Sequence, residues 1–293
     1  MAGSADRVLR VQSRLTDRDR QILGWLADHD VLTTFHIAHA LFPSLDFAQR
    51  RLLTLHQLGL LDRFRPLRPG GGSYPWHYVL GRLGADLVAA SREQPPPRPS
   101  HVTARAHRIA TNRNLGHRLG VNGFFTDLAG HARTHPGTRV ERWWSERHCA
   151  QPGAFAAALI SPIRPDGHGI MADRHRRVAF FLEHDTGTEP LRVLTTKMAN
   201  YANHAARGGP NWPVLFWLHS RTREQHLHHA LTGADVRGPV ATAVQQDADG
   251  PVDPAGPIWL THRGSHAPRR LLDLTDLGDP APTPDDETPN EAN

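Results

Sequence analysis

The chain has one cysteine and one lysine among its 293 residues. With Cys149 alone, no intramolecular disulfide can form, and zinc sites built from paired cysteines are excluded. The longest run of small apolar residues, AFAAALI, is far too short to span a bilayer, so we expect a soluble, cytoplasmic protein with no membrane partner. All other residues of the Lys and Arg type are arginines, and a coding bias this strong would be expected to have replaced the lysine too. The presence of Lys197 therefore raises the question of its role.

The charge of the chain is unevenly distributed. The net charge is +5, yet residues 279–293 carry five acids and no base, so the remainder is about +10. A basic body with an acidic, proline-containing tail suits a polyanion such as double-stranded DNA, although scattered arginines also promote solubility. A length of 293 residues with 39% hydrophobic content is sufficient for two domains, each with its own core.

The first part of the chain has the pattern of a winged helix-turn-helix domain, over residues 15–90. Thr16, Thr34 and Ser44 stand where helix N-caps are expected, and apolar residues follow each of them at helical spacing. Two short strands, LLDRFRPLR and WHYVL, flank a GGG loop, and a closing helix ends near Ala90. Residues 91–100, SREQPPPRPS, form a proline-rich linker.

The third helix and the two-stranded wing carry side-chain types that bind DNA. Arginine and glutamine can bond base edges in the major groove, while arginines on a wing can meet phosphates. Winged helices also serve as protein-docking modules, so this alternative stays open. The candidate DNA-binding residues are Gln49, Arg50, Thr54, Gln57, Arg63, Arg65 and Arg68.

The second part, residues 101–265, is expected to be an α/β domain with a mixed central sheet. A long helix is followed by three strands near 139–146, 163–171 and 178–185, a helix near 190–205 and a strand at 214–220. Shorter elements follow, and residues 266–293 are expected to be an acidic, disordered tail.

Three acids are expected at one edge of this sheet. Alternate side chains of a strand share a face, so Glu183 and Asp185 should point the same way, with Asp166 alongside if its strand is a neighbour. Partly buried carboxylates repel one another, and a hard divalent cation such as Mg²⁺ or Mn²⁺ would compensate them. Pairing of the acids with nearby arginines, such as Arg164, Arg176 or Arg192, is the structural alternative.

Lys197 is expected on the helix after these strands, at the border of its sheet-facing stripe. From there its ammonium can reach the acids, where it could orient water or neutralise charge on a phosphate as a compact point charge. A solvated helix residue is the alternative role for Lys197.

The motif RPDG, then LEHD, then a helix bearing a lysine resembles the PD-(D/E)XK superfamily of restriction-endonuclease-like proteins. In that resemblance Asp166 matches the PD acid and Glu183 the second acid, and both would hold metal and water at the sheet edge. Asp185 stands where the motif has lysine, so Lys197 would be a lysine displaced onto the next helix. Glu146 could be a further acid.

The opening LTDRDRQILGWLADHDVLTT and the segment LEHDTGTEPL also resemble the replication-relaxation family of plasmid-associated winged-helix proteins, over roughly residues 15–230. The resemblance implies a role in replication or relaxation of plasmid or mobile-element DNA, with replication or mobilisation proteins as partners, and no assigned catalytic activity. Two functions therefore fit the sequence. One is a DNA-binding protein with a metal-dependent nuclease or nickase site, and the other is a winged-helix transcription regulator whose nuclease-like domain is inactive and mediates docking or homodimerisation.

Overall fold

The computed structural model describes residues 11–67, 70–156, 162–248, 250–263 and 267–283. The chain divides into two compact units, Met1–Gly130 and His131–Asn293, called unit 1 and unit 2 below. Helices and a mixed six-stranded sheet place the protein in the α/β class that was expected. No helix in the described part of the chain is both long enough and apolar enough to cross a bilayer.

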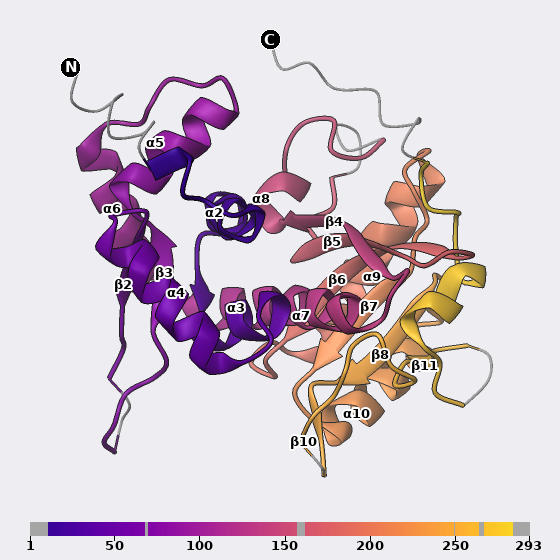
Figure 1. The fold of residues 1–293 in the computed structure, drawn as a ribbon. Coiled ribbons are helices and arrows are strands. Elements are labelled where there is room, and N and C mark those ends of the chain that lie inside the picture. The colour runs from indigo at the N-terminus through magenta and orange to yellow at the C-terminus, as the bar shows by residue number, and fades with distance from the viewer. Residues whose placement is uncertain (1–10, 68–69, 157–161, 249, 264–266, 284–293) are drawn as a thin grey trace. The chain divides into compact units, whose positions relative to one another are not determined.

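Unit 1 begins with three helices at the expected positions: α2 (Asp17–His29), α3 (Thr34–Leu41) and α4 (Leu45–Gln57) (Figure 1). The N-caps of α2 and α4 are Thr16 and Ser44, as predicted, whereas α3 is capped by Thr33, one residue earlier than expected. Each cap hydroxyl accepts a hydrogen bond from a backbone N–H of the first turn, which otherwise has no partner within the helix. Gly59 ends α4 with a φ of 76°, a left-handed conformation that glycine adopts without strain.

A three-stranded antiparallel sheet and a closing helix follow in unit 1, where a two-stranded hairpin and a closing helix were predicted. The hairpin strands are β2 (Leu61–Phe64) and β3 (His77–Leu80), and α5 (Arg82–Ser91) follows them. The short strand β1 (Leu32–Thr33), which was not expected, pairs with β3 on the side away from β2. It was missed because a two-residue strand has no periodicity to detect.

The expected single long helix after the linker is two helices, α6 (Pro99–Ala110) and α7 (Leu115–Thr134). Asn112 interrupts it, since its side-chain oxygen accepts a hydrogen bond from the backbone N–H of Asn114, an alternative to continued helix. Asp30 of unit 1 forms ion pairs with Arg105 and Arg118. These contacts hold α6 and the first part of α7 to unit 1, so the division between units falls after residue 130 instead of in the proline-rich linker at 91–100.

The sheet of unit 2 has the strand order β11-β8-β7-β6-β5-β4. Strands β4 (Arg139–Ser145), β5 (Gly167–Ala172) and β6 (Arg177–Asp185) pair antiparallel in succession, and β7 (Val214–Leu218) and β8 (Val240–Val244) continue parallel to β6. The parallel pairs require crossovers, which α9 (Leu191–Ala206) and α10 (Arg221–Gly233) supply.

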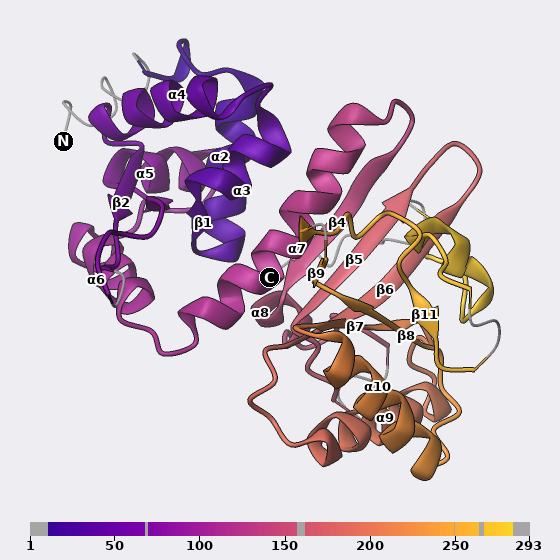
Figure 2. The same cartoon turned by 90° about the horizontal axis from the view of Figure 1, so that it is seen from below.

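Helices α9 and α10 pack side by side against one face of this sheet (Figure 2). Their apolar stripes, which include Leu194, Met198 and Leu227, join Phe181 and Phe216 of the strands in one buried cluster. Shorter elements complete the unit: the helical turn α8 (Glu146–Cys149), strands β9 (Gln246–Asp247), β10 (Gly250–Pro251) and β11 (Leu260–Thr261), and the 3-10 helix η1 (Leu271–Asp276).

The expectation of a disordered tail from residue 266 is wrong for its first part. In η1 the side chains of Leu271 and Leu274 are fully buried, and the backbone of Arg269 pairs with that of Trp259. Apolar burial of this kind holds a segment in place whatever the charge of the residues that follow it. Residues 284–293, which hold most of the tail acids, lie outside the described residues.

Candidate functional site

The end of β6 places two acids on the face that α9 and α10 cover. Phe181 packs in the cluster beneath these helices, and the period of two along the strand turns Glu183 and Asp185 the same way. This shared direction is what the sequence predicted. The two carboxylates nevertheless contact different helices, Glu183 reaching α9 and Asp185 reaching α10.

Glu183 is only 2% exposed, and each of its carboxylate oxygens accepts a hydrogen bond from α9. Lys197 Nζ donates to Oε2 at 2.7 Å, and the Tyr201 hydroxyl donates to Oε1 at 2.6 Å. Lys197 and Tyr201 are four residues apart, so they lie one turn apart on the same helix face. The single lysine of the chain therefore binds one of the three acids that it was expected to reach, and its side chain is 30% exposed.

Asp166 lies immediately before β5 and across from Glu183. The antiparallel register pairs Gly167 with Leu182, which brings the preceding residue of β5 beside the following residue of β6. Asp166 Oδ2 accepts a hydrogen bond of 2.8 Å from the backbone N–H of His184. The predicted neighbourhood of β5 and β6 is thus confirmed, and with it the proximity of these two acids.

The electrostatics of this group follow from burial and close charge. Burial, and then the charge of Asp166, raise the pKa of Glu183 from 4.5 to about 7, against the opposing effects of Lys197 and Tyr201. Burial by itself lowers the pKa of Lys197, but the charges of Glu183 and Asp166 outweigh it and raise that pKa. The ammonium is therefore charged at neutral pH.

Two further side chains complete the surroundings and were not assigned a role from the sequence. Burial and the adjacent Glu183 raise the pKa of Tyr201, which keeps its hydroxyl protonated as a donor. Cys149 of α8 is buried nearby, and burial raises the pKa of its thiol, so it remains a neutral thiol. The position of Tyr201 four residues after Lys197 is the sequence signal that could have identified it.

Asp185 does not join the other acids. Arg223 of α10 donates to both of its oxygens, at 2.7 and 3.1 Å, and also donates to the carbonyl oxygen of Glu189. Arg223 thereby ties the loop after β6 to the start of α10. Pairing of an acid with arginine was the structural alternative, but the expected arginines were closer in sequence.

The donor set of this site decides which metal ion it could hold. Within the described part of the chain, no three or more His, Cys, Asp or Glu side chains are placed to hold a metal ion, because Asp185 is turned to Arg223. The expected set of three carboxylates is therefore not assembled. Mg²⁺ is commonly held by one or two carboxylates with water and substrate phosphate, so Asp166 and Glu183 fit such an ion.

The candidate DNA-binding residues lie on the outer face of α4 and on the hairpin of unit 1. On α4, Gln49, Arg50, Thr54 and Gln57 are all exposed. Arg50 is paired with Asp46 one turn earlier, and the Thr54 hydroxyl donates to the Arg50 carbonyl oxygen at 3.0 Å. An exposed pair of this spacing is worth only about 0.3–0.5 kcal/mol, so a phosphate or base can replace Asp46 as the partner of Arg50.

The hairpin arginines are organised by an aromatic ring that the sequence analysis did not single out. The guanidinium of Arg63 lies over the Trp76 ring at 4.1 Å and that of Arg65 at 5.2 Å from its centroid. Arg65 also donates to the carbonyl oxygen of Tyr74 at 2.7 Å. Arg68, the third expected arginine, lies outside the described residues.

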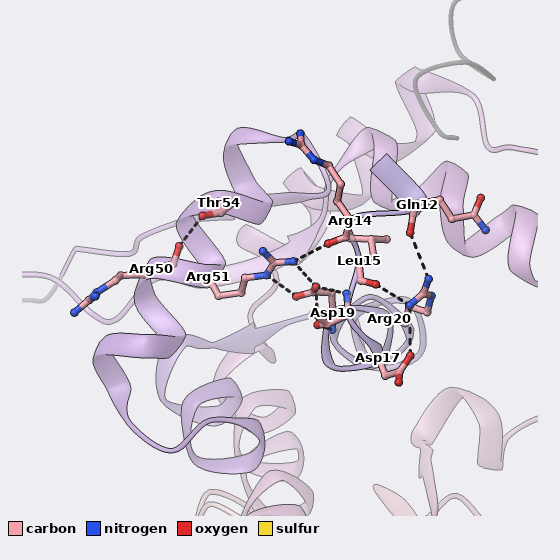
Figure 3. A network of polar contacts seen from close by, with 10 residues as sticks. Gln12, Arg14, Leu15, Asp17, Asp19, Arg20, Arg50, Arg51 and Thr54 are labelled. Carbon is pink, nitrogen blue, oxygen red and sulfur yellow. Dashed lines mark hydrogen bonds and ion pairs between the residues drawn. The ribbon is translucent and has the colours of Figure 1, made fainter. Parts of the chain in front are cut away.

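A buried ion pair holds α4 against α2 (Figure 3). Arg51 of α4 donates to both carboxylate oxygens of Asp19, at 2.9 and 2.5 Å, and to the carbonyl oxygen of Arg14. Asp19 is fully buried, and it also accepts from the Thr16 hydroxyl and backbone N–H as part of the α2 capping box. This pair sets the orientation of the helix that exposes Arg50.

Comparison with known proteins assigns the chain to a family. No curated protein and no solved structure matches the chain. A family profile described as replication-relaxation matches residues 23–215, which is more than half of the chain and includes α4, the hairpin, Asp166, Glu183 and Lys197. The chain therefore belongs to the replication-relaxation family.

Proposed function

We propose that this protein binds double-stranded DNA during replication or relaxation of plasmid or mobile-element DNA, and that unit 2 carries a nuclease or nickase site. In this proposal unit 1 is a winged helix-turn-helix domain that contacts DNA through α4 and the β2–β3 hairpin. Unit 2 is a PD-(D/E)XK-like domain that acts on a phosphodiester. Family membership supports a role in replication or relaxation, and the arrangement of Asp166, Glu183 and Lys197 supports the chemistry.

One observation carries the nuclease proposal: Lys197 Nζ lies 2.7 Å from Glu183 Oε2. The motif would place its lysine at the position of Asp185, whereas Lys197 comes twelve residues later, on the following helix. The ammonium thus reaches the acid from the next helix. Three antiparallel strands followed by a helical crossover to a parallel strand are also consistent with the PD-(D/E)XK resemblance.

Each member of this site would have a distinct role toward a bound phosphodiester. Lys197 offers a compact positive charge that is partly open to solvent, which suits an anionic phosphate or a water hydrogen-bonded to the ammonium. Glu183, which accepts a hydrogen bond from Lys197 through one carboxylate oxygen, would offer its negative charge to a bound cation. Tyr201 fixes the orientation of that carboxylate by donating to its other oxygen.

Asp166 and Glu183 would hold Mg²⁺ or Mn²⁺. When bound, such an ion polarises a phosphate oxygen and lowers the pKa of a coordinated water. Asp185 would not ligate the ion, since its two oxygens accept from Arg223. We infer that Arg223 instead fixes the loop next to the site.

Cleavage of supercoiled plasmid by the purified chain, with Mg²⁺ or Mn²⁺, tests this function. Nicked or linear product is expected with the wild type, and both Asp166→Ala and Glu183→Ala should abolish it while duplex binding persists. Lys197→Arg keeps the charge but replaces the ammonium with a planar fork, so a large loss of rate is expected. Arg192→Lys, at an exposed position of the same helix, is the matched control and should cleave normally. Cleavage that survives Glu183→Ala would point to a contaminating nuclease.

Duplex binding is tested separately, by affinity at several salt concentrations. If about six phosphates are contacted, affinity should fall by roughly a thousandfold between 50 and 200 mM salt. Arg50→Ala should weaken a preferred sequence by about 1–3 kcal/mol and spare random DNA, whereas Arg65→Ala should weaken both and flatten the salt dependence. Absence of any duplex binding would refute the role of unit 1 as a DNA reader.

The hydrogen bonds that Glu183 and Asp185 already accept from the protein favour a second function. Glu183 accepts from Lys197 and Tyr201, and Asp185 accepts from Arg223, so both carboxylates already have protein partners. This pattern also suits a transcription regulator in which unit 2 is an inactive scaffold for docking or homodimerisation. Duplex binding without cleavage, and without Mn²⁺ binding by calorimetry, would make this function the better one.

A further inference from the structure

Unit 1 contains a cavity that the proposed function does not use. It has a volume of about 180 Å³ and is lined by residues of β3, α5 and α6, of which α6 contacts both other elements. All of its lining residues belong to unit 1, and none of them is a candidate DNA-binding residue or one of the acids near β6. The cavity is therefore separate from both parts of the proposed function.

The floor of the cavity is apolar. Val102, Ala106 and Ile109 follow one another at a spacing of four and then three residues, so they share one face of α6. Val79 and Leu80 of β3 line the same cavity, and Val79 is buried in one cluster with Ile109. This floor can receive an apolar group but offers it no polar partner.

A second row of α6 residues lines the cavity with basic side chains. His101, Arg105 and Arg108 have the same spacing of four and then three residues and share the neighbouring face of the helix. His101 and Arg108 are exposed, so they lie where the cavity opens to solvent. The cavity thus combines an apolar interior with a basic mouth.

The charge at this mouth is only partly compensated within the protein. Asp30, the acid among the described lining residues, accepts from Arg105 at 2.6 Å and from Arg118 at 2.5 Å. The guanidinium of Arg108 forms no hydrogen bond or ion pair with any residue in the described part of the chain. One acid therefore faces three arginines, and Arg108 keeps its donors available for an anion.

The walls of the cavity are held in place without a ligand. Pro97, from the linker before α6, forms one wall, and its carbonyl oxygen accepts from Arg82 Nη1 of α5 at 2.6 Å. Arg105 also donates to the carbonyl oxygen of Ala27 at 2.7 Å, which fixes α6 against the end of α2. A ligand would enter a largely preformed site, as is usual for small-molecule pockets.

We propose that this cavity binds a small organic acid whose apolar part is the size of a single ring, with its carboxylate held by Arg108. An apolar protein cavity of about 150 Å³ is sufficient to hold benzene, so about 180 Å³ admits one ring and a short acidic substituent. The planar guanidinium of Arg108 can donate two parallel hydrogen bonds to a carboxylate. The ligand bridges α6 and β3, so its binding stabilises unit 1.

Saturation-transfer NMR on the full chain, with benzoate as the probe, tests the proposal. The wild type should bind benzoate at millimolar concentration, and acetate, which has the charge without the ring, should not displace it. Arg108→Gln should weaken benzoate binding by roughly 10–100-fold but leave that of the neutral benzyl alcohol unchanged, because only the charged contact is lost. Arg113→Gln removes an exposed arginine that does not line the cavity, and this matched control should bind as the wild type does.

Filling the cavity gives a second, independent measurement. Ala106→Phe places a ring in the space that the ligand would occupy, so binding of both benzoate and benzyl alcohol should be lost. If this variant melts below the wild type, Val102→Phe, at a half-buried position of the same row, replaces it. Benzoate should raise the melting temperature of the wild type but not that of the filled variant. Absence of benzoate binding by the wild type would overturn the proposal, as would equal binding by the filled variant or an equal loss in Arg113→Gln.

Discussion

Replacement of Glu183 by glutamine is expected to stabilise unit 2 at pH 8 in metal-free buffer. Burial and the neighbouring Asp166 raise the pKa of Glu183 from 4.5 to about 7 in the folded protein, so ionisation is less favourable there than in the unfolded chain. A group whose pKa is higher in the folded protein than in the unfolded chain stabilises the fold through its protonated form. For Glu183 this stabilisation is fully present below pH 4.5 and is lost as the pH rises through about 7. Glutamine does not ionise, so the variant avoids this loss.

The size of the effect follows from the shift. Each pKa unit corresponds to about 1.4 kcal/mol, so a change from 4.5 to about 7 sets an upper limit of about 3–4 kcal/mol at pH 8. Glutamine retains an oxygen that can accept from Tyr201, while Lys197 loses its charged partner and turns to solvent through its exposed part. We therefore expect a net gain of about 1–3 kcal/mol at pH 8 that diminishes toward pH 5.

Urea unfolding at pH 5, 6, 7 and 8 with a chelator provides the measurement, and tryptophan fluorescence reports mainly unit 2, which holds five of the seven tryptophans. Glu189→Gln is the matched control, because Glu189 is exposed and lies 3.9 Å from Lys197. Its stability should follow that of the wild type at every pH. If Glu183→Gln instead loses about 3–5 kcal/mol at pH 8, the pair with Lys197 is a structural ion pair and the reasoning from the raised pKa is refuted.

Three other predictions concern buried groups whose environments are equally defined. Asp19→Ala should lower the free energy of unfolding of unit 1 by about 3–5 kcal/mol in urea titrations, because it leaves Arg51 without its buried partner, whereas the exposed Asp17→Ala should change it by less than about 0.5 kcal/mol. Burial lowers the pKa of His168 to about 3, so the neutral ring is favoured, and its contribution to stability is present above pH 6.5 and lost as the pH falls; His168→Asn should reduce this acid dependence in thermal melts. The Cys149 thiol, buried and with a raised pKa, should resist alkylation by iodoacetamide in the native protein and react once urea unfolds unit 2; rapid alkylation of the native protein would contradict its burial.

Local signals in the sequence determined much of the secondary structure. Thr16 and Ser44 begin helices because a hydroxyl at this position binds free backbone N–H groups, and Gly59 ends one because it adopts a left-handed conformation. The alternation of side chains along a strand put Glu183 and Asp185 on one face before any tertiary contact was known. These features depend on residues within one turn or one strand, which is why they can be recognised without the fold.

Contacts between distant segments were decided by the tertiary structure alone. Asp185 was expected beside the other acids, but packing of α10 brings Arg223 to it from 38 residues away. In the same way Arg51 reaches Asp19 across 32 residues, and Leu271 is buried in a segment whose neighbours suggested a disordered tail. Periodicity along a strand specifies the face on which a side chain lies, whereas the partner of that side chain depends on which helix packs over the face. In this chain α9 brings Lys197 to Glu183, and α10 brings Arg223 to Asp185.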